Sequence, residues 1–157
     1  MKRYIFTFFL FCFAVFCYAQ ESVEINKTID GFKFIKVQTG WSESTHRPGT
    51  MFPEVRLLIK NVSGSEVTNI PALQNQLTYA FSEDDIVIKE GDNYIHSSSR
   101  PAWKPNVSKY VSLAITPSFR NLGDKYKNKN LTLEIYYHDK FLCKVNIAPV
   151  LADWQSQ

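Results

Sequence analysis

The residue types that most often carry catalysis or bind metals are few in this chain and widely spaced. It has three histidines, His46, His96 and His138, and none belongs to a His-x-His or His-x-x-x-His pair. A zinc site needs three or four converging ligands from histidine, cysteine or carboxylate side chains. The spacing alone therefore predicts no metal site, and a metal would require the fold to bring distant residues together.

Cys143 is a candidate nucleophile, because a thiolate beside a base can attack a carbonyl group. Its alternate neighbours Phe141, Val145 and Ile147 are apolar. This pattern places all four side chains on the inward face of a strand, where a free cysteine behaves as a small hydrophobe. The chain also has no Gly-x-Ser-x-Gly motif and no glycine-rich phosphate or dinucleotide motif. We expect no catalytic residues, no cofactor and no enzymatic activity.

Three consecutive acids, Glu83, Asp84 and Asp85, could join Asp92 to ligate calcium through oxygen atoms. The segment lacks the ligand spacing and the glycine of an EF-hand loop. A solvated turn that also blunts a sheet edge accounts for the same residues, and we prefer this interpretation. Convergence of these acids with the histidines depends on the fold.

An aromatic residue among polar neighbours predicts a binding surface. Trp41 lies in a long polar segment, residues 39–50, together with His46 and Arg47. Exposed aromatic rings in such surroundings stack on sugars or on partner side chains. We therefore choose Trp41, His46 and Arg47 as candidate binding residues, with Tyr94 and Tyr110 as secondary ones. The alternative is a loop that only covers an open sheet edge.

The N-terminal residues have the pattern of a secretory signal. Lys2 and Arg3 precede an apolar run, residues 4–16, and small residues then flank a cleavage position after Ala19. The run is too short to span a bilayer comfortably. An N-terminal anchor, or a lipoprotein with its lipid on Cys17, are the alternatives. We predict a signal peptide at 1–19 and a single secreted or periplasmic domain at 20–157, with no transmembrane segment after cleavage.

Removal of the signal changes the composition. Cys143 becomes the only cysteine, so no intrachain disulfide can form and the core must stabilise the domain. The formal charge of +3 includes Lys2 and Arg3 and falls by two, to near +1. No overall basic surplus remains to drive binding to nucleic acids or anionic membranes.

Apolar residues recur with a period of two in five segments, which is typical of strands with one buried face. The inward sets are Val55, Leu57 and Ile59; Leu77, Tyr79 and Phe81; Val111, Leu113 and Ile115; Leu131, Leu133, Ile135 and Tyr137; and Phe141, Cys143, Val145 and Ile147. In the segment GFKFIKVQT, apolar residues fall on both faces, which predicts a further strand with a bulge or two-sided burial.

Short polar segments predict the turns between strands. They are residues 63–65, residues 90–93 and residues 138–140. In the stretch VRLLIKNVSGSEV, Asn61 then ends a core strand and the following turn reverses it, so replacing Asn61 by alanine should have a mild effect. Many short strands at this spacing predict an all-β, antiparallel sandwich of about eight strands, with a small closed β-barrel as the alternative.

The order of EVRLLIKNVSGSEV, DDIVIKEGDNYI, AWKPNVSKYVSLAI and LTLEIYYHDK resembles the immunoglobulin-like domains of small secreted bacterial proteins of the telokin-like, immunoprotective extracellular type. The resemblance covers residues 32–147. It implies an immunoglobulin-like sandwich with a binding or structural role and no shared catalytic residues. This chain departs from the pattern at Asn106, where glycine is usual, and in the length of the loop assigned to Trp41.

These observations favour a secreted or periplasmic, non-enzymatic module that binds a protein or a glycan. One alternative is a periplasmic inhibitor or immunity-type protein that blocks a secreted enzyme. The other is a small β-barrel that carries a ligand or hydrolyses one. The identity of the ligand and the oligomeric state do not follow from the sequence.

Overall fold

The chain forms a sandwich of two antiparallel sheets. The computed structural model describes residues 21–43, 48–69, 73, 75–92, 102–113 and 130–150. These residues include β1 (Ser22–Ile29), β2 (Phe32–Glu43), β3 (Met51–Asn61), β4 (Leu77–Glu83), β5 (Ile86–Asp92), β6 (Ser108–Ser112), β7 (Leu131–Tyr137) and β8 (Lys140–Asn146). The predicted signal peptide and its cleavage site lie outside the described residues.

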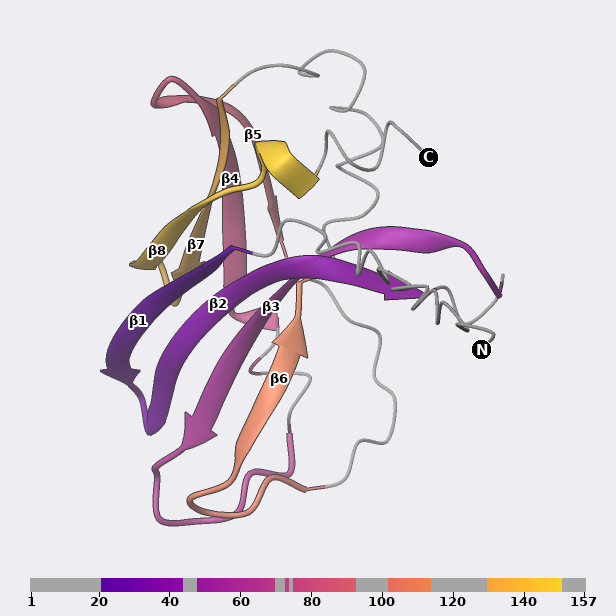
Figure 1. Ribbon diagram of the computed structural model, residues 1–157. Coiled ribbons are helices and arrows are strands. Elements are labelled where there is room, and N and C mark those ends of the chain that lie inside the picture. Colours follow the sequence, from indigo (N-terminus) through magenta and orange to yellow (C-terminus); the bar gives the residue numbers. More distant parts are fainter. Residues whose placement is uncertain are drawn as a thin grey trace, which may run out of the picture.

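The two sheets have the strand orders β1-β2-β3-β6 and β5-β4-β7-β8 (Figure 1). The all-β sandwich is thus confirmed, and the alternative of a closed barrel is wrong because the strands form two separate four-stranded sheets. The chain crosses from β3 to β4, returns from β5 to β6 and crosses again from β6 to β7. Seven of the strands match positions of an immunoglobulin sandwich: β2, β3 and β6 those of A, B and E, and β4, β5, β7 and β8 those of C, C′, F and G. β1 adds a strand beside A, and no described strand takes the place of D.

The inward faces of both sheets supply the core. The alternating residues of β3 and β7 are buried as predicted, and Phe34, Leu57, Phe81 and Ile135 are fully inaccessible to solvent. Trp103 is fully buried and its ring lies 5.7 Å from that of Phe32, which fills one end of the sandwich. Burial of this apolar surface is the main favourable term in folding. The described cysteine, Cys143, is free and adds no disulfide to it.

Two bulges explain why simple alternation fails in two strands. The register of β2 on β3 shifts between Phe34 and Lys36, so both Phe34 and Val37 face the core, as the two-sided pattern predicted. A second shift, in the pairing of β7 with β8, makes Leu142 and Cys143 consecutive buried residues. The prediction that Phe141 faces inward is therefore wrong, and its side chain is 46% exposed.

Three hairpins turn on pairs of residues with positive φ, and the first is Asp30 and Gly31 between β1 and β2. His138 and Asp139 join β7 to β8, as predicted. Asp84 and Asp85 join β4 to β5, so the acidic segment is a turn that leads into an edge strand. The turn predicted at residues 90–93 is wrong in its described part, because residues 90–92 continue β5 and pair with β4. Aspartate tolerates positive φ, so the chain reverses at the two aspartates instead.

The bend at residues 63–65 does not form a hairpin, which corrects the predicted reversal into a paired strand. β3 pairs with β2 and β6, and the chain leaves the sheet after Asn61. Val67 then forms an isolated bridge with Trp103. The bend therefore starts the crossing to the second sheet, at the end of the sandwich that Trp103 fills. Within the described ranges, no helix is long and apolar enough to cross a membrane.

Candidate functional site

The residues chosen from the sequence do not form one surface. Trp41 belongs to β2 and pairs with Pro53 of β3, so its prediction as a loop residue is wrong. It alternates with Val37 and Thr39, which are buried, and so it lies on the core side of the sheet. The strand continues to Glu43 because its pairing with β3 continues to Met51.

Tyr110 lies on the outward face of the same sheet, where it pairs with Leu58 of β3. Its side chain is 48% exposed. The guanidinium carbon of Arg56 is 4.9 Å from the centre of its ring, which is a cation–π contact. Trp41 and Tyr110 therefore point to different sides. His46, Arg47, Tyr94 and His96 lie outside the described residues.

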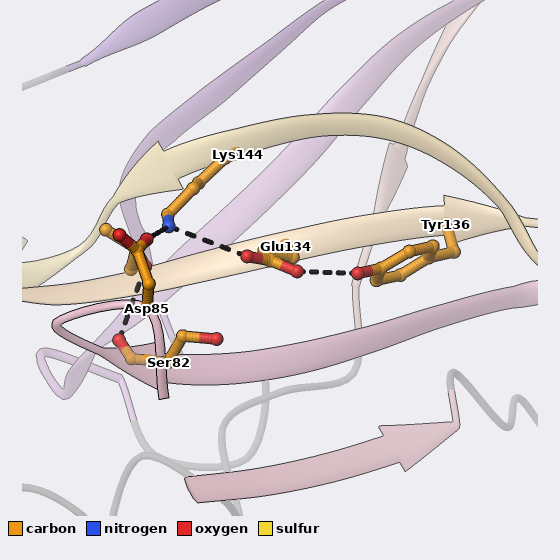
Figure 2. A network of polar contacts seen from close by, with 6 residues as sticks. Ser82, Asp85, Glu134, Tyr136 and Lys144 are labelled. Carbon is orange, nitrogen blue, oxygen red and sulfur yellow. Dashed lines mark hydrogen bonds and ion pairs between the residues drawn. The ribbon is translucent and has the colours of Figure 1, made fainter. Parts of the chain in front are cut away.

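The acidic turn is engaged by a lysine (Figure 2). Lys144 of β8 forms an ion pair with Asp85, and its Nζ lies 3.5 Å from Oε1 of Glu134. The Tyr136 hydroxyl donates to Oε2 of Glu134 at 2.5 Å. The hydrogen bond and the charge of Lys144 lower the pKa of Asp85. In the described parts of the chain, no three His, Cys, Asp or Glu side chains gather in a way that could hold a metal ion.

A pocket of about 430 Å³ opens at the end of the sandwich near Trp103. Four segments converge on it: the β1–β2 turn, the chain that follows β3, the segment before β4, and the β7–β8 turn. Its lining residues are Asp30, Phe32, Ser63, Ser65, Val67, Asn69, Leu73, Gln76, Tyr137 and His138. We call it the Asp30–His138 pocket.

One wall of the pocket depends on a close approach between two turns. Gly31 has φ of +81°, and a Cβ atom at this position would lie 2.7 Å from Cβ of Ser63. The amide of Val62 donates to the Gly31 carbonyl oxygen at 2.8 Å. Only glycine satisfies both the backbone angle and the contact, so it holds the β1–β2 turn against the bend after β3.

The side chain of Asn61 holds the bend at residues 63–65 in place. Its side chain is fully buried, and Nδ2 donates to the carbonyl oxygens of Ser65 at 2.8 Å and Trp103 at 2.9 Å. Its Oδ1 accepts from the amide of Ser63 at 3.0 Å and from the Ser63 hydroxyl at 2.7 Å. A buried amide with these four bonds has nearly all of its hydrogen-bonding capacity satisfied. The position of Ser63 and Ser65 is thus set by the fold.

The facing wall comes from the β7–β8 turn. The ring of Tyr137 packs 5.0 Å from that of Phe34, and the imidazole of His138 meets it edge-on at 4.6 Å. Burial, and then the negative charge of Asp30, raise the pKa of Tyr137, so the phenol stays protonated. The amide of His138 donates to the Gln76 carbonyl oxygen at 3.2 Å, which joins this wall to the segment before β4.

The chemistry of the pocket is that of a binding site. Its floor is apolar, formed by Phe32, Val67 and Leu73, and its rim carries the half-exposed side chains of Asp30 and His138. Asp30 Oδ2 and His138 Nε2 are 3.9 Å apart. The Ser63 hydroxyl donates a hydrogen bond to the side-chain amide oxygen of Asn61, which cannot act as a general base.

Sequence reasoning placed His138 at a turn but missed Asp30 and the two serines. The signal was present in the turn types: IDGF, VSGSEV and YHDK are all short polar breaks between strands. In a Greek-key sandwich, turns at one end come together although they are far apart in sequence.

No protein-family model matches this chain, and neither the curated proteins nor the solved structures include a significant match to it.

Proposed function

We propose that the protein is a secreted, non-enzymatic binding module with an immunoglobulin-like fold, and that it holds one group of a protein or glycan ligand in the Asp30–His138 pocket. The observation that carries this proposal is the convergence of four segments on a pocket with an apolar floor and a polar rim. Loops at the ends of rigid sandwiches commonly carry binding residues.

The size and lining of the pocket indicate what it can accept. Its volume of about 430 Å³ lies in the range of small-molecule sites. One sugar unit or one side chain of a peptide fits that volume. Asp30 and His138 would hydrogen-bond the polar atoms of the group, while Leu73 and Val67 would contact its apolar face.

Two other features support a non-enzymatic, immunoglobulin-like assignment. The orders β2-β3-β6 and β5-β4-β7-β8 correspond to strands A-B-E and C′-C-F-G of an immunoglobulin sandwich, which supports the proposed resemblance to secreted telokin-like domains. The one described thiol, Cys143, is buried, and burial raises its pKa to about 12. A thiol in this state is a poor nucleophile.

Binding can be tested with a labelled sample of the mature chain and two panels of probes, simple methyl glycosides and N-acetyl amino-acid amides. We expect one panel to perturb the amide NMR signals of residues that line the pocket. Asp30→Asn and His138→Gln should each weaken that response several-fold, because they remove the charged or polar rim atoms. Asp139→Asn, an exposed change beside the pocket, should leave it intact.

The proposal would be wrong if neither panel perturbed the pocket, or if the perturbed signals centred on another surface. It would also be wrong if Asp30→Asn and Asp139→Asn gave equal responses in folded samples. Binding of glycosides and not of amino-acid amides, or the reverse, decides between a glycan and a protein ligand.

The inhibitor or immunity alternative has one observation of its own. Ile86 and Val87, next to the β4–β5 turn, are 70% and 49% exposed. Exposed apolar residues on a projecting hairpin can enter the cleft of a partner enzyme. If the protein inhibits a secreted hydrolase in this way, its Ile86→Ser variant should no longer inhibit that enzyme, while its Asp30→Asn variant should still do so. The opposite pattern favours the pocket.

A further inference from the structure

Where all four strands of the sheet β1-β2-β3-β6 pair, the outward face presents its side chains as three rows of four. The first row is Thr28, Lys33, Lys60 and Ser108; the second is Glu24, Lys36, Leu58 and Tyr110; and the third is Ser22, Gln38, Arg56 and Ser112. The members of each row lie opposite one another across the strands, so all twelve side chains share one face. We call this surface the β2–β3 face.

Positive charge is concentrated on its two central strands. Lys33 and Lys36 come from β2, and Arg56 and Lys60 come from β3. The rows contain one carboxylate, Glu24, which lies opposite Lys36 at the edge. A second carboxylate, Glu54, precedes Arg56 on the same face and accepts a hydrogen bond from the Ser112 hydroxyl, so four cations face two carboxylates. The whole chain has a formal charge of only +3, so this face holds more positive charge than the average of the chain predicts.

Lys33 and Lys60 lie directly opposite each other. Like charges in this arrangement destabilise a sheet, because their side chains stand about 5 Å apart at Cβ. Their other neighbours in the row are the neutral residues Thr28 and Ser108. Among the described residues, no ion pair neutralises either lysine. A local cost of this kind is common where a surface meets a partner of opposite charge.

The rest of the face is polar and carries one exposed aromatic ring. Tyr110 is 48% exposed and stacks against Arg56. The edge positions of the rows are mostly serine and threonine, which are short and carry hydroxyl groups. A sugar ring can stack on Tyr110 while its hydroxyls bond to these side chains.

We propose that the β2–β3 face binds an acidic polysaccharide, whose carboxylate or sulfate groups contact Lys33, Lys60 and Arg56 and one of whose sugar rings stacks on Tyr110. This surface is separate from the Asp30–His138 pocket and does not depend on it. An acidic polysaccharide fits better than an acidic protein because only two of the twelve row residues, Leu58 and Tyr110, are apolar or aromatic, whereas protein interfaces are anchored by buried apolar and aromatic side chains. It fits better than a nucleic acid because a single exposed ring serves a sugar, whereas bases need several stacking platforms.

The proposal can be tested by measuring the affinity of the mature chain for heparin, for polygalacturonate and for neutral dextran, at several salt concentrations. Binding to at least one acidic polymer and not to dextran is expected. Preference for heparin identifies sulfate as the recognised group, and preference for polygalacturonate identifies carboxylate. Oligo(dT) and a polyglutamate serve as competing polyanions.

The informative variant is Lys33→Gln combined with Lys60→Gln. It should weaken binding about tenfold and reduce the slope of log affinity against log salt by up to about two, since two cations are lost. Its melting temperature should not fall, because the repulsion between the lysines is removed. The matched control, Lys27→Gln combined with Lys140→Gln, changes the net charge equally but lies away from this face, and it should retain the parent affinity.

Tyr110→Ala separates stacking from charge. It should weaken binding several-fold and leave the salt slope unchanged. The proposal is overturned if neither acidic polymer binds, if dextran binds equally well, or if the control pair loses as much affinity as the Lys33 and Lys60 pair. Tighter binding of oligo(dT) or polyglutamate than of both polysaccharides would also overturn it.

Discussion

The side-chain amide of Asn61 donates to the carbonyl oxygen of Trp103 at 2.9 Å, although 42 positions separate the two residues in sequence. Both residues are fully buried. Two backbone hydrogen bonds reinforce this link. The backbone N–H of Asn61 donates to the Val107 carbonyl oxygen at 3.1 Å, and the Asn61 carbonyl oxygen accepts from the N–H of Asn106 at 2.8 Å. Asn61 therefore ties the end of β3 to the segment before β6, beneath the Asp30–His138 pocket.

This arrangement revises the expectation that Asn61→Ala is mild. The substitution leaves the Trp103 and Ser65 carbonyl oxygens and the Ser63 amide without their side-chain partner. We expect a loss of about 2–4 kcal/mol in the free energy of unfolding, measured by urea denaturation. Gln38→Ala, on the partly exposed outer face, should change it by less than about 0.5 kcal/mol. A loss below 1 kcal/mol for Asn61→Ala would show that water or a rearranged bend replaces these bonds.

Alanine substitutions at three glycines distinguish the stability cost of a strained backbone from the cost of a steric clash. Gly31 has φ of +81° and no room for a Cβ atom; Gly64 has φ of +80° and open space; Gly40 has open space and needs no positive φ. Gly64→Ala should cost about 1 kcal/mol from the left-handed backbone alone, whereas Gly40→Ala, inside β2, should stabilise the fold by up to about 0.5–1 kcal/mol. Gly31→Ala should cost at least about 2 kcal/mol more than Gly64→Ala, because the bend at Ser63 must move. Equal losses at Gly31 and Gly64 in thermal or urea denaturation would refute the role assigned to the contact.

The β7–β8 turn offers a stabilising change. Asp139 is exposed, lies outside the pocket and has φ of +59° in a two-residue turn. Asp139→Gly supplies the residue that such turns prefer at this position and should raise the free energy of unfolding by about 0.5 kcal/mol. Asp139→Val should lower it by at least about 1 kcal/mol, because a β-branched side chain resists positive φ. If the two variants had the same stability, the turn would have a different backbone from the one described.

The sequence allowed the fold class to be predicted because alternation is a local property of each strand. Val55, Leu57 and Ile59 alternate without interruption, and their burial followed directly. Errors arose where one residue changed the register. The bulge at Leu142 exposes Phe141, and no local signal distinguished it from regular alternation. The β4–β5 turn was misplaced because Glu90, Gly91 and Asp92 have turn-forming types but are held in β5 by their pairing with β4.

The site was harder to predict than the fold because its residues meet only through the Greek-key connections. Asp30 and His138 belong to different sheets and come within 3.9 Å of each other at one end of the sandwich. Each lies in a turn whose composition is ordinary. Trp41, in contrast, had the composition expected of a binding residue, but its alternation with Val37 and Thr39 assigns it to the core side of β2.

The thiol of Cys143 provides a test of core burial that depends on pH. Burial raises its pKa from the ordinary 9.0 to about 12, and the positive charge of Lys27 offsets this only in part. The thiolate is the reactive form, so iodoacetamide at pH 8 should modify the folded protein at least about a hundred-fold more slowly than the urea-unfolded protein.

Between pH 9 and 12 the Cys143 thiol of the unfolded protein loses its proton, while that of the folded protein keeps it. The folded state thus binds more protons, and its stability should fall as the pH rises through this range. Burial raises the pKa of Tyr137 as well and gives a slope of the same sign. The comparison is therefore made with Cys143→Ala, which keeps Tyr137 and should show a shallower decline. Equal slopes, or equal alkylation rates in the folded and unfolded protein, would mean that β8 opens readily and that Cys143 is not held in the core.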